Sequence, residues 1–214
     1  MRSGPASRIT PSVDAPGYAF LAQGRLFVAE PGAEPREVES KFADEYRARV
    51  RKIRKKQAWK EQGAGARFMR GGPLWGDDMD LEAVPVAFTG VAPGHAPGTV
   101  IYSVSTGVVG GVFLLDLASG EERRLFHSAD HRIEHLATSP DHEVVACTLR
   151  GKGGTSSVAV MAADGSEIFE VTDGDVIDLA PSWLPKDAIE DPERRHQLVF
   201  QSAGIGRDAG GVFV

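Results

Sequence analysis

Three histidines recur at intervals of four residues, at His127, His131 and His135, with Asp130 between them. On one face of a helix this spacing would bring three imidazoles together, and such a set can bind zinc. The surrounding residues instead follow a strand, turn, strand pattern, which separates the three side chains. We therefore expect solvated or hydrogen-bonded loop histidines and no metal. A metal site formed by these three histidines is the less favoured alternative.

Other short motifs predict no catalytic residue. The Gly-x-Ser-x-Gly pattern of a nucleophile elbow does not occur in the sequence. Residues 151–156, Gly-Lys-Gly-Gly-Thr-Ser, share the composition of a phosphate-binding loop but lack its spacing and open no helix. A hairpin turn is the better interpretation. We expect no cofactor.

A different chemistry is concentrated between Lys41 and Arg70, where eleven basic residues accompany three acidic ones. The segment from Ser40 to Gln62 contains no glycine or proline and predicts a helix with Ser40 as its N-cap. One narrow apolar stripe runs along it, at Phe42, Tyr46, Val50 and Ile53. The rest of its surface is cationic and predicts a docking element. The candidate docking residues are Arg47, Arg51, Lys52, Arg54, Lys55, Lys56 and Trp59.

Three occupants of this cationic surface remain open. Outside residues 41–70 the chain holds 13 basic and 27 acidic residues, so the helix could dock on the protein's own acidic remainder. An acidic protein partner would serve equally, and interleaved Tyr46 and Trp59 could accompany phosphate contacts to nucleic acid. The overall acidity counts against extended nucleic-acid binding. We therefore favour a protein partner, or the remainder of its own chain, over nucleic acid.

Composition limits the class of protein. Of 214 residues, 42% are hydrophobic and 25% charged, which excludes a disordered chain or a collagen. No apolar stretch is long enough for a membrane span, and residues 1–14 lack the apolar centre of a secretory signal. The single cysteine, Cys147, requires no oxidising compartment and is expected to be a buried small hydrophobe. We predict a cytoplasmic protein without a membrane partner.

The 25 glycines and 13 prolines favour a turn-rich, β-rich fold, and some of them mark a repeat of β-strands. Gly120 and Gly165 close equivalent turns 45 residues apart, and Pro140 and Pro185 have the same separation. The tripeptide Gly-Val-Phe at 111–113 recurs at 211–213. Four strands in each repeat of about 45 residues are typical of a β-propeller blade.

The turns of this repeat resemble those of TolB-like β-propellers, a branch of the WD-repeat-like family. The matching segments are Ala137–His142 (Ala-Thr-Ser-Pro-Asp-His), Pro181–Asp187, Leu115–Gly120 and Met161–Gly165. The similarity covers about residues 84–214 and, more weakly, 18–40. His142 stands where the family usually has glycine, so that turn is expected to be distorted. The resemblance implies an all-β chain of four-stranded antiparallel blades. The basic α-helix is not part of the family pattern and is expected to be an insertion between the first and second blades. Counting the repeats gives three blades and a partial one, so the ring is expected to be incomplete.

The expected organisation has four parts. Residues 1–17 are a flexible N-terminus, 18–40 a first β-meander or blade, 41–83 the inserted basic helix and loop, and 84–214 consecutive blades with the last one truncated. Propellers need about four to eight blades to close, which suggests a fragment of a larger protein or assembly.

Two functions follow as expectations. The first is a non-catalytic propeller scaffold that mediates protein–protein interaction. The alternative rests on resemblance to prolyl-oligopeptidase-like and tricorn-like serine peptidases, whose propeller portions accompany a catalytic domain. Here that domain would lie beyond residue 214, and this chain would carry no catalytic motif of its own.

Overall fold

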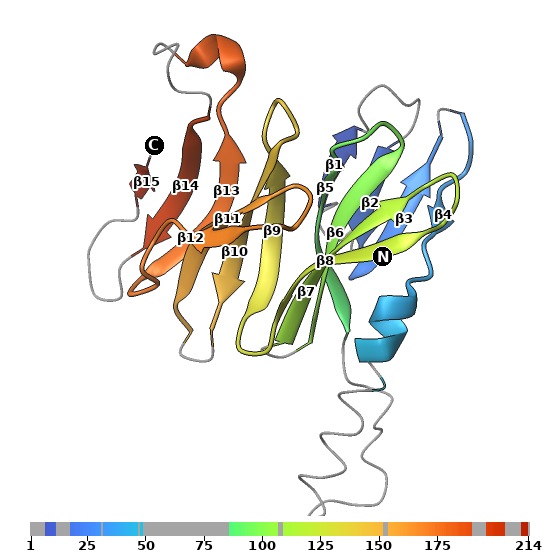
Figure 1. The fold of residues 1–214 in the computed structure, drawn as a ribbon, viewed down its shortest axis with the longest axis horizontal. Coiled ribbons are helices and arrows are strands. Elements are labelled where there is room, and N and C mark those ends of the chain that lie inside the picture. Colours follow the sequence, from blue (N-terminus) through green and yellow to red (C-terminus); the bar gives the residue numbers. More distant parts are fainter. Residues whose placement is uncertain are drawn as a thin grey trace, which may run out of the picture. The chain divides into compact units, whose positions relative to one another are not determined.

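A computed structural model describes residues 7–11, 18–30, 32–46, 48, 86–106, 109–151, 154–189, 196–203 and 211–213. The chain divides into two compact units, residues 40–86 and the remainder. The larger unit consists of antiparallel sheets that follow one another along the chain (Figure 1). In the smaller unit the described part of the predicted helix is residues 41–46 and position 48.

The first two blades each have four described strands. Blade 1 contains β1 (Ser7–Pro11), β2 (Tyr18–Ala22), β3 (Arg25–Ala29) and β4 (Arg36–Glu37). Blade 2 contains β5 (Ala87–Pro93), β6 (Thr99–Thr106), β7 (Val109–Asp116) and β8 (Glu122–Ser128). In both sheets the spatial order of the strands equals their order in the sequence, as in a propeller blade.

Blade 3 follows the same plan, and three strands of blade 4 are described. Blade 3 contains β9 (Arg132–Thr138), β10 (Val144–Arg150), β11 (Ser156–Ala162) and β12 (Ile168–Glu170). Blade 4 contains β13 (Ile177–Trp183), the 3-10 turn η2 (Lys186–Ala188), β14 (Leu198–Ala203) and β15 (Gly211–Phe213). One parallel bridge, Ser156 to Ile177, joins these two blades. Over the described residues the ring of blades is incomplete, as predicted.

The N-terminal prediction requires a correction. Residues 1–17 were expected to be flexible throughout, but β1 lies within them and pairs with β2, with Thr10 opposite Ala19. This strand is short and polar, and its hydrogen-bonding partner lies in the following segment. Local composition therefore did not reveal it. The first blade begins at Ser7 rather than at Tyr18.

The predicted helix begins as expected. The Ser40 hydroxyl accepts a hydrogen bond from the Ala43 amide at 3.2 Å, which is the N-cap contact. Tyr46 of the apolar stripe is buried and Phe42 is half-buried. Val50 and Ile53 lie outside the described residues.

The core between blades 2 and 3 comes from strand alternation. Ile101 and Val112 of blade 2 pack with Val145, Cys147 and other apolar residues of blade 3, and all four are fully buried. Aspartates close the outer turns: Asp116 accepts hydrogen bonds from the Ala118 and Ser119 amides at 2.9 and 2.8 Å. These local bonds lower the pKa of Asp116, with the Ser119 contact the largest cause.

Candidate functional site

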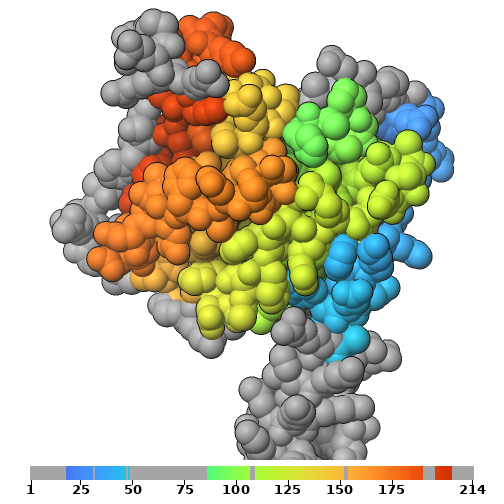
Figure 2. Space-filling view, viewed as in Figure 1, coloured from blue at the N-terminus to red at the C-terminus, as the bar shows by residue number. Residues whose placement is uncertain are grey.

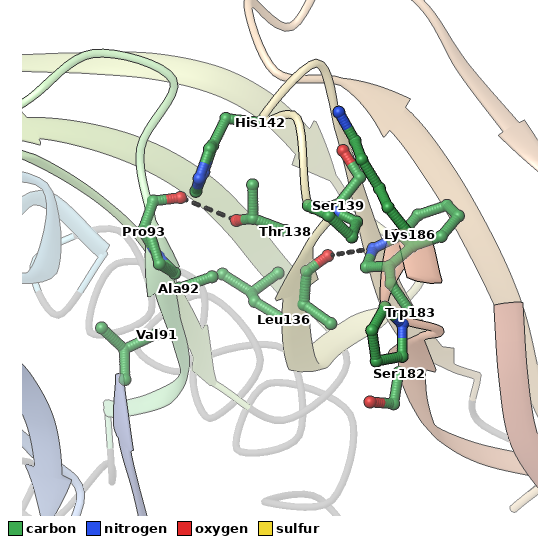
Figure 3. A pocket seen from close by; sticks show the side chains of 13 residues that line it. Val91, Ala92, Pro93, Leu136, Thr138, Ser139, His142, Ser182, Trp183 and Lys186 are labelled. Atoms are coloured by element: carbon green, nitrogen blue, oxygen red, sulfur yellow. Dashed lines mark hydrogen bonds between the residues drawn. The ribbon is translucent and has the colours of Figure 1, made fainter. Parts of the chain in front are cut away.

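A pocket of about 590 Å³ lies where the innermost strands of blades 2, 3 and 4 end (Figure 3). Val91, Ala92 and Pro93 at the end of β5 form one wall. The second wall comes from the end of β9 and the turn after it, and the third from the end of β13 and from η2. The lining residues of these two walls are Leu136, Ala137, Thr138, Ser139, Pro140, His142, Ser182, Trp183, Pro185 and Lys186.

Hydrogen bonds between blades hold the walls together. The Thr138 hydroxyl donates to the Pro93 carbonyl at 2.7 Å, and the Trp183 indole N–H donates to the Ala137 carbonyl at 2.8 Å. Figure 3 draws both bonds as dashed lines. Pro93, Thr138 and Trp183 are spaced by 45 residues and end their respective strands. The repeat therefore brings three different side chains to one pocket.

Asp141 lies in the turn after β9, between the pocket residues Pro140 and His142, and makes several polar contacts. Its carboxylate accepts hydrogen bonds from the Ser139 hydroxyl at 2.6 Å and the Glu143 amide at 3.2 Å, and it lies 2.7 Å from His196 Nε2. Partial burial raises the pKa of Asp141, but the bonds from Ser139, His196 and Glu143 outweigh it and lower the pKa to about 2. Because Asp141 belongs to blade 3 and His196 to blade 4, this contact ties the two blades.

The His196 ring also contacts Trp183, the aromatic residue of the pocket. It meets the Trp183 ring at 5.5 Å between centroids and at 63°, an edge-on contact. With its N–H bound and its ring flanked, the Trp183 side chain is held in one orientation.

One cluster could hold a metal. The ligand atoms of Asp141, Glu143 and His196 lie within 4.8 Å of one another, and no other such group occurs in the described part of the chain. The hydrogen bonds of Asp141 already account for the positions of the Asp141 and His196 side chains. The geometry therefore gives no separate reason for an ion.

His142 adopts the left-handed backbone conformation, with φ of 62°. It thereby keeps the turn that glycine would make, because its amide donates to the Ser139 carbonyl at 2.9 Å. The turn that was predicted to be distorted therefore keeps its hydrogen bond, and the strain lies in the left-handed backbone of His142. His142 Nδ1 is buried without a hydrogen-bond partner in the structure, while Lys186 at the rim is exposed. The pocket combines apolar walls with a few polar groups, a lining suited to binding.

The candidate metal ligands do not converge. His127 lies on β8, His131 in the following loop and His135 on β9. Their ring nitrogens form no ligand group of three, and His131 Nδ1 instead lies 3.3 Å from the Ser128 hydroxyl. The absence of a metal remains a prediction.

The candidate docking residues lie outside the described residues. These are Arg47, Arg51, Lys52, Arg54, Lys55, Lys56 and Trp59. Conversely, sequence analysis missed the pocket. The 45-residue spacing of Pro93, Thr138 and Trp183 was the available signal, whereas the contact between Asp141 and His196 spans 55 residues and follows from the fold.

Comparisons with known proteins bear on the fold. No protein-family model matches the chain, and no curated protein matches it. A solved structure assigned as TolB from Agrobacterium tumefaciens aligns at 17% identity and a TM-score of 0.53, covering 98% of this chain and 62% of its own. TolB from Acinetobacter baumannii aligns at 13% identity and a TM-score of 0.46, and the alignment covers 93% of this chain and 39% of that protein. The tricorn protease aligns at 14% identity and a TM-score of 0.37, and the alignment covers 94% of this chain and 20% of that protein.

The chain thus spans 62% of the length of the Agrobacterium protein. Among the described residues, no helix is long and apolar enough to cross a membrane. The antiparallel order of strands within each blade is that of a propeller, and the Agrobacterium likeness supports the same fold. The fold of this chain is a TolB-like β-propeller: three blades have four described antiparallel strands each, and among the described residues a helix is inserted between the first and second blades.

Proposed function

We propose that this chain is a non-catalytic scaffold that binds a protein partner, as part of a larger cytoplasmic protein or assembly. The pocket between three blades carries this proposal. Its volume of about 590 Å³ lies within the range of about 300–1,000 Å³ typical of small-ligand pockets, so it is large enough to receive a side chain. A partner would insert an apolar side chain there.

Trp183 would be the main contact in the pocket. Its ring is held by the hydrogen bond to the Ala137 carbonyl and by the edge contact with His196. Binding a partner would therefore cost little side-chain conformational entropy at this residue. Interface energy is concentrated in a few buried residues, and tryptophan is enriched among them. Loss of this ring is therefore expected to weaken binding more than loss of another aromatic ring of the chain.

The basic helix would be a second docking element. Its charge suits an acidic partner or the acidic remainder of this protein, and nucleic acid is the less favoured occupant. A variant with alanine at Lys52, Arg54, Lys55 and Lys56 tests this part separately. A salt-dependent gel shift that disappears in this variant would favour nucleic acid instead.

Affinity capture with matched variants tests the proposal. Wild-type protein, Trp183→Leu and the control Phe20→Leu are immobilised after circular dichroism confirms that each is folded. Phe20 lies in β2 of blade 1, outside the pocket. We expect a partner that is retained by wild type and control and is reduced at least tenfold by Trp183→Leu. Equal retention by all three would refute the role of the pocket.

The peptidase alternative stays a prediction. The likeness to the tricorn protease, with a TM-score of 0.37, is too weak to support it. A Gly-x-Ser-x-Gly motif with later Asp and His in the same reading frame, beyond residue 214, would favour that alternative.

A further inference from the structure

The pocket between the three blades has basic groups but no acidic group in its described lining. The ionisable residues of that lining are His142, in the turn after β9, and Lys186, in η2. The protein carries a formal net charge of -6, so this lining is a local exception to its charge. In Figure 2 the yellow surface of the turn after β9 and the orange-red surface of η2 lie at the same end of the blades.

The His142 imidazole has an unused hydrogen-bonding atom. Its Nδ1 is buried from solvent and has no hydrogen-bond partner among the described residues. A buried polar atom without a partner is costly, and a bound ligand can supply the missing hydrogen bond. Figure 3 shows the His142 ring extending from its turn toward the Pro93 side of the pocket.

The turn itself does not require a side chain at position 142. Its hydrogen bond runs from the His142 amide to the Ser139 carbonyl, at 2.9 Å, and glycine would form the same bond. With φ of 62° the backbone is in the left-handed region, where glycine avoids the strain that histidine bears. The imidazole is therefore held at the pocket at a cost to the turn, and a binding role explains why a histidine is placed there.

Three other polar side chains of the lining are bonded within the protein. The hydroxyls of Thr138 and Ser139 and the indole N–H of Trp183 each donate a hydrogen bond to another residue. These bonds fix the walls of the pocket. The charge of the lining comes from His142 and Lys186, so these two select the polar part of a ligand.

The rest of the lining is apolar. In Figure 3 the side chains of Val91, Ala92 and Leu136 lie below His142 in the view. A ligand that fits both parts of the pocket joins an apolar group to an anionic one. A carboxylate suits the polar part, because it accepts a hydrogen bond from an imidazole N–H and attracts a lysine ammonium group.

We propose that the partner segment that enters the pocket carries an acidic side chain next to its apolar one. The acidic carboxylate accepts a hydrogen bond from His142, which holds its proton on Nδ1 in the complex, and it lies near Lys186. The neighbouring apolar side chain packs on Leu136 and Trp183. This segment belongs to the partner of the proposed function, on which this inference rests. An acidic side chain also agrees with the acidic partner expected for the basic helix.

Titration with short peptides tests this proposal. The probes are acetyl-Gly-Leu-Glu-Gly-amide, its glutamine analogue, and acetyl-Gly-Gly-Leu with a free carboxyl terminus. Each is added to the ¹⁵N-labelled 214-residue chain, and the indole N–H resonance of Trp183, assigned by its loss in Trp183→Leu, reports binding. The variants are His142→Gly, which suits the left-handed turn, and Lys186→Gln. The matched control is His135→Gly, at an exposed position outside the pocket with φ of 53°.

The ratio of the dissociation constants of the glutamine and glutamate peptides is the measured quantity. We expect the glutamate peptide to bind wild type and His135→Gly at least fivefold more tightly than the glutamine peptide. His142→Gly should bring the two within about twofold, and Lys186→Gln should reduce the ratio by about half. A ratio near one in wild type, a ratio that persists in His142→Gly, or no binding of the glutamate peptide up to about 10 mM would overturn the proposal. Tighter binding of the peptide with a free terminus would overturn it in favour of a chain terminus.

Affinity capture judges the proposed function separately. A partner that is lost in Trp183→Leu but fully retained by both His142→Gly and Lys186→Gln would keep the pocket as a docking site and overturn the acidic side chain. Selective binding of the glutamate peptide without any captured partner would support the preference of the pocket for an acidic group and refute the scaffold.

Discussion

Replacement of Gly165 by alanine is expected to destabilise the protein far more than the same replacement of Gly120. The two glycines close equivalent outer turns 45 residues apart, with φ of 80° and 71°. A Cβ at Gly120 would meet no atom within 4 Å, whereas one at Gly165 would lie 2.7 Å from the Leu125 carbonyl oxygen and 2.9 Å from its Cα. The pair therefore separates backbone strain from the packing of one blade on the next.

The magnitudes follow from these two contributions. A left-handed alanine costs about 1 kcal/mol at either position. At Gly165 the overlap with backbone atoms, which cannot rotate away, adds about 1–3 kcal/mol. We expect Gly120→Ala to lower the free energy of unfolding by about 1 kcal/mol and Gly165→Ala by about 2–4 kcal/mol.

Urea unfolding followed by circular dichroism measures the difference. With a slope of about 3 kcal/mol/M, an additional 2 kcal/mol moves the midpoint down by about 0.7 M. Losses that agree within about 0.5 kcal/mol would show that the turn of blade 3 does not press on β8.

Two further predictions concern titratable groups. Asp141 has a pKa of about 2 in the folded protein and an ordinary value near 3.8 when unfolded, so its stabilisation is complete above about pH 5 and is lost as pH falls toward 2. The lowered pKa corresponds to about 2 kcal/mol of stability, which solvent screening of this partly exposed carboxylate reduces to about 1 kcal/mol. The free energy of unfolding, measured with urea, should therefore fall less steeply between pH 5 and pH 2 in Asp141→Asn than in wild type. The control Asp187→Asn changes an exposed carboxylate of η2 and should keep the wild-type pH dependence. An unchanged pH dependence in Asp141→Asn would contradict the assignment. Burial raises the pKa of the Cys147 thiol to about 12, so it should react with a thiol reagent at pH 8 only after unfolding, and prompt reaction in the native protein would contradict its burial.

The sequence predicts the strands well because alternation and turn chemistry are local. Asp116 and Gly120 set one outer turn through bonds within five residues, and the structure has that turn. The strand β1 was missed because its pairing partner lies outside it. The inner-strand bulges escaped prediction for a related reason: His135 and Ala180, 45 residues apart, have φ of 53° and 52° beside register shifts that alternation alone does not indicate.

The pocket could not be predicted because it depends on which residues the repeat places side by side. A 45-residue period puts equivalent positions of successive blades in contact, as the bond from the Thr138 hydroxyl to the Pro93 carbonyl shows. The outer turns repeat the same residue, glycine at positions 120 and 165. The ends of the inner strands differ from blade to blade, as Pro93, Thr138 and Trp183 do. Departures from the repeat at such positions are therefore where a propeller acquires a specific binding surface.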